Sequence, residues 1–166
     1  MPIAKEKLEA FAERLTRATE IDFARLAAYV DGEGTIFIQG SKEKRTHVLT
    51  LIVANTDNRL ITWLQNTFGG NVYFSHSKAQ RFRGNTICYS WRVFEERAEI
   101  VLKRILPYMI CKGEQAQVAL NYRTLKAQGS RGHKVTVEVF QAREALRAKV
   151  LEMNSSSMHK TLVNAR

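Results

Sequence analysis

The sequence predicts an α+β domain in which helices cover one face of a four-stranded antiparallel sheet. Two observations lead to this prediction. The spacing of apolar residues changes from a helical period to strict alternation near residue 34 and again near residue 70, so that the order helix, strand, strand occurs twice. No linker long enough to separate two domains interrupts the 166 residues, and a chain of this length can form one hydrophobic core.

The first half of the chain is expected to contain two helices and a β-hairpin. Leu8, Phe11 and Leu15 follow helical spacing and predict an amphipathic helix over 4–18. Asp22 is a candidate N-terminal cap for a second helix over 23–31, which Gly34 ends. Two alternating strands follow at 35–39 and 46–54. The residues expected to face the core from this hairpin are Ile36, Ile38, Leu49, Leu51 and Val53.

The second half repeats the pattern and then becomes helical. A helix from Thr56 to Phe68 is ended by two glycines, and strands follow at 71–77, with Val72 and Phe74 inward, and at 86–93. The remaining helices are expected over 95–106, 112–127 and 136–152, the last stopped by the polar run that begins at Asn154. We therefore expect an N-terminal helical extension over 1–20, a single domain over 21–153 and a polar C-terminal tail over 154–166.

The charge balance indicates a polyanionic partner. The chain has 26 Lys and Arg against 16 Asp and Glu, a net charge of +10, and a pI near 9.9. Nucleic acid is the simplest such partner, although many soluble proteins are basic without binding it. No apolar run approaches the ~20 residues of a membrane span. The charged N-terminus does not resemble a signal peptide, so we expect an intracellular protein of the cytoplasm or an organelle matrix.

The sheet face opposite the helices is a candidate DNA-binding surface. Edge cations would contact phosphates, while side chains within the sheet would read base edges in the major groove. A merely solvated face is the alternative, because outward positions of an antiparallel sheet are usually polar. The face is expected to carry Phe37, Gln39, Ser41, Val48, Thr50, Ile52, Tyr73, Ser75, Ser77, Ser90 and Arg92, with Lys42, Lys44, Arg45, Lys78, Arg81 and Arg83 at its edges.

The end of the second helix has an unusual composition. Leu26 to Val30 is apolar throughout, as expected for a buried helix, and it leads directly into Asp31 and Glu33. Acidic side chains are disfavoured at a helix C-terminus by about 0.3–1 kcal/mol each, because the helix dipole is negative there. The segment either needs a counterion or is an ordinary core helix whose final acids lie in solvent.

These nine residues, 26–34, resemble the signature motif of the LAGLIDADG homing endonucleases. Leu26, Ala27, Asp31 and Gly34 match the motif outright. The expected element order also resembles that family's αββαββα core with its saddle-shaped sheet, over residues 22 to about 160. The resemblance implies a site-specific endonuclease that hydrolyses phosphodiester bonds of double-stranded DNA and leaves 3′ overhangs. It implies no small-molecule substrate. A stand-alone chain without splicing-domain sequence favours an intron-encoded enzyme.

The resemblance assigns roles to individual residues. Glu33 stands at the position of the metal-binding carboxylate, where Asp is more usual, and the Gly32 carbonyl is a further candidate ligand. Mg²⁺ is the expected ion; Mn²⁺ would substitute for it, and Ca²⁺ would support binding without cleavage. Lys112, after a Pro-aromatic turn, and the pair Asn55 and Arg59 are the other candidate catalytic residues. His159 and Lys160 fall in a segment that resembles a loop touching the DNA backbone.

A single motif implies a homodimer, because cutting both strands of a duplex requires two sites. The helix over 23–31 is the expected interface. Ala24, Ala27 and Ala28 are small enough to let two such helices approach closely, and Asp31 is expected beside them. A two-fold dimer would bind a long pseudo-palindromic target.

Two other classes of protein stay open at this point. One is a non-cleaving DNA- or RNA-binding protein on the same fold, such as an intron maturase or a regulator. The other is a basic structural or ribosome-associated protein in which the motif is a coincidence. The second class predicts neither metal dependence nor a dimer through residues 23–31.

Overall fold

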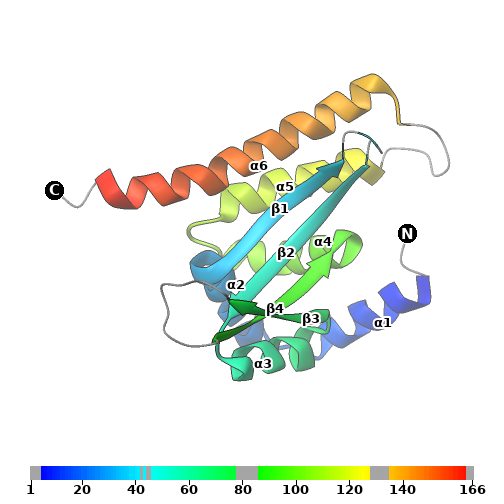
Figure 1. Cartoon of the computed structure of the whole chain (residues 1–166). Helices are drawn as coiled ribbons and strands as arrows, with labels where there is room; N and C mark the ends of the chain where they lie inside the picture. The colour runs from blue at the N-terminus through cyan, green and yellow to red at the C-terminus, as the bar shows by residue number, and fades with distance from the viewer. Residues whose placement is uncertain (1–4, 42, 44–45, 78–85, 128–134, 164–166) are drawn as a thin grey trace.

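The computed structural model describes residues 5–41, 43, 46–77, 86–127 and 135–163. These residues form helices and one antiparallel sheet with the strand order β1-β2-β4-β3 (Figure 1). The elements are α1 (Lys5–Thr16), α2 (Glu20–Glu33), β1 (Gly34–Ser41), β2 (Thr46–Asn55), α3 (Asn58–Phe68), β3 (Asn71–Ser77), β4 (Thr86–Phe94), α4 (Glu95–Ile105), the 3₁₀ helix η1 (Leu106–Tyr108), α5 (Gly113–Ala127) and α6 (Val137–Val163). The predicted α+β class and the repeated helix, strand, strand order are confirmed.

The sheet is built from two hairpins joined through their second strands. β1 pairs with β2, β3 pairs with β4, and β2 pairs with β4 at the centre. Helices α2, α4 and α5 pack against one face of the sheet, and α6 lies along α5 and β1. Within the described residues, no helix is both long enough and apolar enough to span a membrane.

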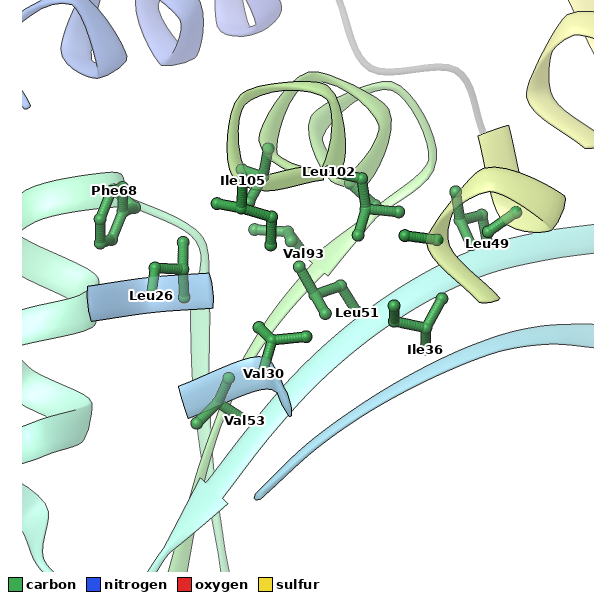
Figure 2. Packing of buried hydrophobic residues seen from close by; sticks show 14 of the residues in the cluster. Leu26, Val30, Ile36, Leu49, Leu51, Val53, Phe68, Val93, Leu102 and Ile105 are labelled. Atoms are coloured by element: carbon green, nitrogen blue, oxygen red, sulfur yellow. The ribbon is translucent and has the colours of Figure 1, made fainter. Parts of the chain in front are cut away.

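The core lies between α2, α4 and the inner face of β2. Val30 of α2, Leu51 of β2 and Ile105 of α4 belong to one fully buried cluster (Figure 2). Burial of each such side chain contributes roughly 1.5–3 kcal/mol. The alternation of β2 therefore predicted its inner face correctly, because Leu49, Leu51 and Val53 all have no exposed surface.

Two element ends differ from the prediction. Thr19, not Asp22, is the N-cap of α2: the Thr19 hydroxyl accepts the Asp22 N–H, and Asp22 accepts the Thr19 N–H in return. The residues form a capping box, in which the acid occupies the third helical position. Phe74 was expected to face the core but is 71% exposed. It lies on edge strand β3, from whose described side chains Val72 packs against the core.

Helix α6 does not stop at Asn154 but continues to Val163. Asn and Ser usually end helices because their side chains compete for nearby backbone groups. Here the Asn154 amide instead donates to the Ile36 carbonyl of β1 at 3.1 Å and accepts from Gln115 of α5 at 2.7 Å. Ser155 donates back to the Leu151 carbonyl. The predicted stop is therefore wrong, because these polar side chains are occupied without breaking the helix.

Candidate functional site

The end of α2 presents the Glu33 carboxylate beside the end of β2. β1 follows α2 without a loop, and Gly34 pairs with Val53, so Asn55 lies next to the last turn of α2. The Asn55 Nδ2 donates to Glu33 Oε2 at 2.5 Å. The Asn55 Oδ1 accepts the Asp57 N–H at 2.8 Å, which orients the amide toward the carboxylate. The predicted residues Glu33 and Asn55 thus form one contact, and Glu33 is exposed.

Lys112 supplies the counterion that the acidic helix end requires. Its Nζ donates to the carbonyls of Val30 at 2.8 Å and Gly34 at 2.6 Å. A cation in this position compensates the negative end of the helix dipole. Burial lowers the pKa of the Lys112 ammonium, and the charge of Asp31 opposes this shift only in part. The Lys112 ammonium therefore contacts the backbone of the last turn of α2.

Asp31 contacts a different part of the chain from Glu33. Its carboxylate accepts the backbone N–H groups of Ile110 at 2.6 Å and Lys112 at 2.9 Å. These contacts fix the segment that leads into α5, and so they place Lys112 at the end of α2. The carboxylate is thus engaged within the chain, and a role for Asp31 at a dimer interface stays a prediction.

Arg59 lies on the first turn of α3 and pairs with Asp57. Its Nη2 and Nε donate to the Asp57 carboxylate at 2.6 and 3.1 Å, while the Arg59 side chain remains 92% exposed. The hydrogen bond from Arg59 holds the pKa of Asp57 at about 2. Sequence reasoning missed Asp57, although an Asp just before a periodic apolar helix is a typical N-cap signal. The side chain of Arg59 therefore contacts Asp57, whereas Glu33 contacts Asn55.

The open face of the sheet contains an ordered arginine. The Arg92 guanidinium lies over the Tyr73 ring, 4.7 Å from its centroid, and its Nε donates to Ser90 Oγ at 3.1 Å. Ser90 is consequently only 7% exposed. These contacts hold Arg92 in place before any ligand binds.

A second polar residue of this face is also covered. Thr50 is 1% exposed because its cross-strand neighbours on the same face are Phe37 and Phe94. Strand alternation predicted the correct face for Thr50 and Ser90, but their expected availability to DNA is wrong in the free protein. The other described face residues are exposed or half-buried: Phe37, Gln39, Ser41, Val48, Ile52, Tyr73 and Ser75.

Several predicted DNA contacts cannot be placed. Ser77, His159 and Lys160 belong to β3 and α6 by their backbone, but their side chains lie outside the description. The predicted edge cations that lie outside the described residues are Lys42, Lys44, Arg45, Lys78, Arg81 and Arg83.

Not all of the small residues predicted for the outer face of α2 lie on it. Ala27 has no exposed surface and belongs to the core, so its predicted contact with a second helix is wrong. Ala28 and Gly32 are exposed, and Ala24 is half-buried. A Cβ placed on Gly32 would meet no atom within 4 Å. The small residues available to another helix are therefore Ala24, Ala28 and Gly32.

Glu33 fits a metal ion that is shared with other ligands. In the part of the chain that the structure describes, no group of three or more His, Cys, Asp or Glu residues could hold a metal. Mg²⁺ is usually bound by only one or two carboxylates together with water and substrate phosphates. Glu33 pairs with no Lys or Arg among the described contacts, so its charge is not neutralised by the described residues. The described residues of one chain thus offer part of a metal site, which water and substrate phosphates would complete.

The structure is similar to solved structures of homing endonucleases bound to DNA. It matches the homing endonuclease I-CvuI in complex with its target in the presence of Ca²⁺, with a TM-score of 0.62 and 20% identity over 81% of this chain and 82% of that chain. The archaeal intron-encoded homing endonuclease I-Vdi141I in complex with DNA matches with a TM-score of 0.61 and 12% identity over 81% of this chain and 84% of that chain.

The structure is also similar to part of a longer chain. The LAGLIDADG homing endonuclease I-GzeII in complex with its DNA target matches with a TM-score of 0.61 and 18% identity, over 76% of this chain but only 43% of that chain. No family model and no curated protein matches the sequence. The chain therefore has the fold of the LAGLIDADG homing endonucleases, as its motif and element order predicted.

Proposed function

We propose that this protein is a site-specific endonuclease that hydrolyses double-stranded DNA as a homodimer with Mg²⁺. The observation that carries the proposal is the exposed, unneutralised Glu33 at the end of α2, held by Asn55 where the helix enters the sheet. The structural neighbours, which are DNA endonucleases bound to DNA, support it. In keeping with the resemblance, we expect 3′ overhangs, an intron-encoded origin and an intracellular location.

Each residue of the site has a distinct part in the proposed reaction. Glu33 and the Gly32 carbonyl would hold Mg²⁺, which supplies Lewis-acid activation of water and of the scissile phosphate when bound. Asn55 orients the Glu33 carboxylate. Lys112 holds a positive charge at the end of α2, which would favour the negative charge that develops on the phosphate. Arg59, exposed on the adjoining turn, is placed to contact the DNA backbone.

The second active site would come from a second copy of the chain. Ala24, Ala28 and Gly32 would let two α2 helices pack closely, which brings two Glu33 carboxylates near the two-fold axis. Like charges this close repel each other, and the divalent ions shared with the DNA would relieve the repulsion. Each protomer would place its open sheet face on one half of a pseudo-palindromic target.

The first test is cleavage of a library of randomised duplexes by wild type and by Glu33→Gln, with Mg²⁺, Mn²⁺ or Ca²⁺. We expect double-strand cuts at a long, partly palindromic site by wild type with Mg²⁺ or Mn²⁺, and binding without cuts with Ca²⁺. Glu33→Gln keeps the side-chain volume and should bind the target but not cut it. Cleavage by the variant at the wild-type rate would refute the metal-ligand assignment.

Other outcomes of the same experiment separate the competing functions. Selective binding by wild type without cuts under any ion would instead support a maturase or a regulator. If the protein neither bound nor cut DNA, only the assignment of the fold would remain. Sedimentation of wild type with and without target checks the dimer separately, since a monomer on DNA would contradict the two-copy site.

A further inference from the structure

A hollow on the helical side of the molecule gathers cations and no acids. It has a volume of about 430 Å³ and lies between α1, the end of α3 and α4. Lys7 and Arg14 of α1 and Arg97 of α4 line it, together with the amide side chains of Gln65 and Asn66. None of these residues belongs to α2 or to the sheet, so the hollow is separate from the proposed cleavage site.

The charges of this hollow are not neutralised by neighbouring side chains. On the same helix, Lys5 pairs with Glu9 and Arg17 pairs with Glu13. Lys7, Arg14 and Arg97, by contrast, pair with no carboxylate anywhere in the described ranges. Like charges that share one hollow repel each other, and an anion bound between them removes that repulsion.

The surrounding contacts hold the two arginines in place while leaving donors free. The Arg97 guanidinium lies 5.1 Å from the centroid of the Phe11 ring, and its Nη2 donates to the Lys7 carbonyl at 3.4 Å. Arg14 Nη1 donates to the Gln65 carbonyl at 3.2 Å. A guanidinium has five N–H donors in a planar fork, so most of them remain available to a ligand.

The turn after α3 brings α1 into this position. Gly69 has a φ of +71°, a conformation that side chains rarely adopt, and a Cβ there would lie 3.4 Å from atoms of Phe11 and Arg14. Helix α1 thus packs directly on the turn. The N-terminal helix therefore completes the hollow by adding two of its three cations.

We propose that this hollow binds the phosphodiester backbone of a nucleic-acid strand other than the duplex held on the sheet. Guanidinium groups match the geometry of phosphate oxygens, and an ammonium adds a point charge. Lys7, Arg14 and Asn66 are exposed, so a continuous strand can pass through. Phe11 is only 5% exposed and offers no ring for base stacking. The contact is therefore with phosphates and independent of sequence.

The test compares two double variants that each remove two positive charges from α1. Lys7→Gln/Arg14→Gln alters the hollow, whereas Lys5→Gln/Arg17→Gln removes only the paired cations. Glutamine is a good helix former, so α1 is retained in both. The probe is a labelled single-stranded oligonucleotide of about 20 nucleotides, unrelated to any cleavage target. Its binding to the full chain is followed by fluorescence anisotropy over a range of salt concentrations.

We expect the hollow variant to bind the strand about tenfold more weakly. The slope of the logarithm of the binding constant against the logarithm of the salt concentration should become less steep by about 1.4. This is ~0.7 for each of two lost phosphate contacts. The paired-cation variant should behave like wild type. Equal losses in both variants would refute the proposal, because general charge would then explain the binding.

Nuclear magnetic resonance locates the contact and identifies the ligand class. Addition of the oligonucleotide should shift the backbone amide resonances of Gly69 and Gly70 before that of Gly32. The strand proposal would be overturned if inorganic phosphate shifted the same resonances by the same amount and bound as tightly as the oligonucleotide. The hollow would then be a site for a small phosphate ligand. Strand binding is measured without cleavage, so its failure and the failure of the endonuclease proposal are distinguishable.

Discussion

Asp31 and Glu33 lie close together on the last turn of α2, yet their carboxylates have different partners. Asp31 accepts two backbone N–H groups from the segment before α5, while Glu33 contacts only the Asn55 amide among the described residues. The first acid positions Lys112, which compensates the helix end, and the second is left for an external ligand. The sequence left open whether this helix end needs a cation, and only the family resemblance pointed to Lys112, because Lys112 lies 78 positions after Gly34.

Replacement of Lys112 by Met tests its part in the reaction. Met keeps an aliphatic stem but removes the ammonium that bonds to Val30 and Gly34. We expect cleavage to be slower by about a hundredfold, as for other groups that stabilise transition-state charge, with target affinity close to that of wild type. Single-turnover cleavage and binding in Ca²⁺ measure the two effects separately.

Lys126→Met is a matched control for this variant. Lys126 is also partly buried, and it donates to the carbonyl of His47 at 2.8 Å and to Glu95. Both variants should lose stability, by roughly 1–2 kcal/mol, because each leaves a backbone carbonyl without its charged donor. Only Lys112→Met should slow cleavage. An equal slowing in both, or a loss of affinity alone in Lys112→Met, would contradict a catalytic role.

At the scale of elements, patterns within the sequence predicted the strands and core helices well. Alternation in β2 placed Leu49, Leu51 and Val53 in the core, because a strand that packs on helices shows its burial in its own sequence. The exposure of the outer positions could not be predicted in this way. Thr50 is covered by Phe37 and Phe94, which come from two other strands, so its burial depends on the strand order and register.

The end of α6 shows the same dependence on tertiary contacts. Asn154 joins α6 to β1 and α5 through Ile36 and Gln115. We expect Asn154→Ala to lower the free energy of unfolding by about 1–3 kcal/mol, because the buried Gln115 amide and the Ile36 carbonyl each lose a partner. Hydrogen exchange should become faster in the C-terminal part of α6 before it does so elsewhere.

Ser155→Ala provides the comparison for Asn154→Ala. Ser155 is exposed, and among the described residues its hydroxyl bonds to the Leu151 carbonyl of the same helix. Its removal should change stability by less than about 0.5 kcal/mol. Urea unfolding of both variants measures this difference. Equal stability of Asn154→Ala and wild type would show that Asn154 does not anchor the helix.

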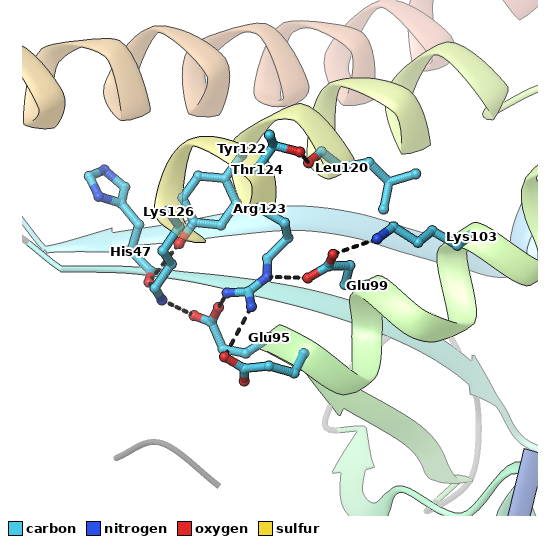
Figure 3. A network of polar contacts seen from close by, with 10 residues as sticks. His47, Glu95, Glu99, Lys103, Leu120, Tyr122, Arg123, Thr124 and Lys126 are labelled. Atoms are coloured by element: carbon cyan, nitrogen blue, oxygen red, sulfur yellow. Dashed lines mark hydrogen bonds and ion pairs between the residues drawn. The ribbon is translucent and has the colours of Figure 1, made fainter. Parts of the chain in front are cut away.

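For the whole molecule, one buried network joins α4 to α5 away from the proposed cleavage site. Arg123 is 5% exposed and bonds to Glu95, Glu96 and Glu99, with distances of 2.5–3.1 Å (Figure 3). Burial acts to raise the pKa values of Glu96 and Glu99, but other interactions outweigh it and lower both. For Glu96 these are a hydrogen bond from its own backbone and the charges of Arg123 and Lys126. For Glu99 they are the hydrogen bonds and charges of Lys103 and Arg123. The network thereby fixes α5, which Lys112 directly precedes.

These lowered pKa values predict how stability depends on pH. A carboxyl whose pKa is lower in the folded state stabilises the fold above its unfolded pKa, and this contribution is lost as the pH falls through the folded pKa. Stability should therefore decrease below a pH of about 4.5. Asp57, whose pKa is about 2, extends the same trend to lower pH.

Arg123→Met separates the network from the other carboxyl groups. Near neutral pH the variant should be less stable by about 3 kcal/mol, because it leaves several carboxylates around a buried position without their cation. This difference should shrink as the pH falls through the lowered pKa values of Glu96 and Glu99, because a protonated carboxyl no longer needs the cation. Arg104→Met, which removes an exposed ion pair with Glu20, should cost less than about 1 kcal/mol at any pH. Urea unfolding at fixed protein concentration measures all three proteins, and a difference for Arg123→Met that stays constant with pH would mean that packing, not charge, explains its effect.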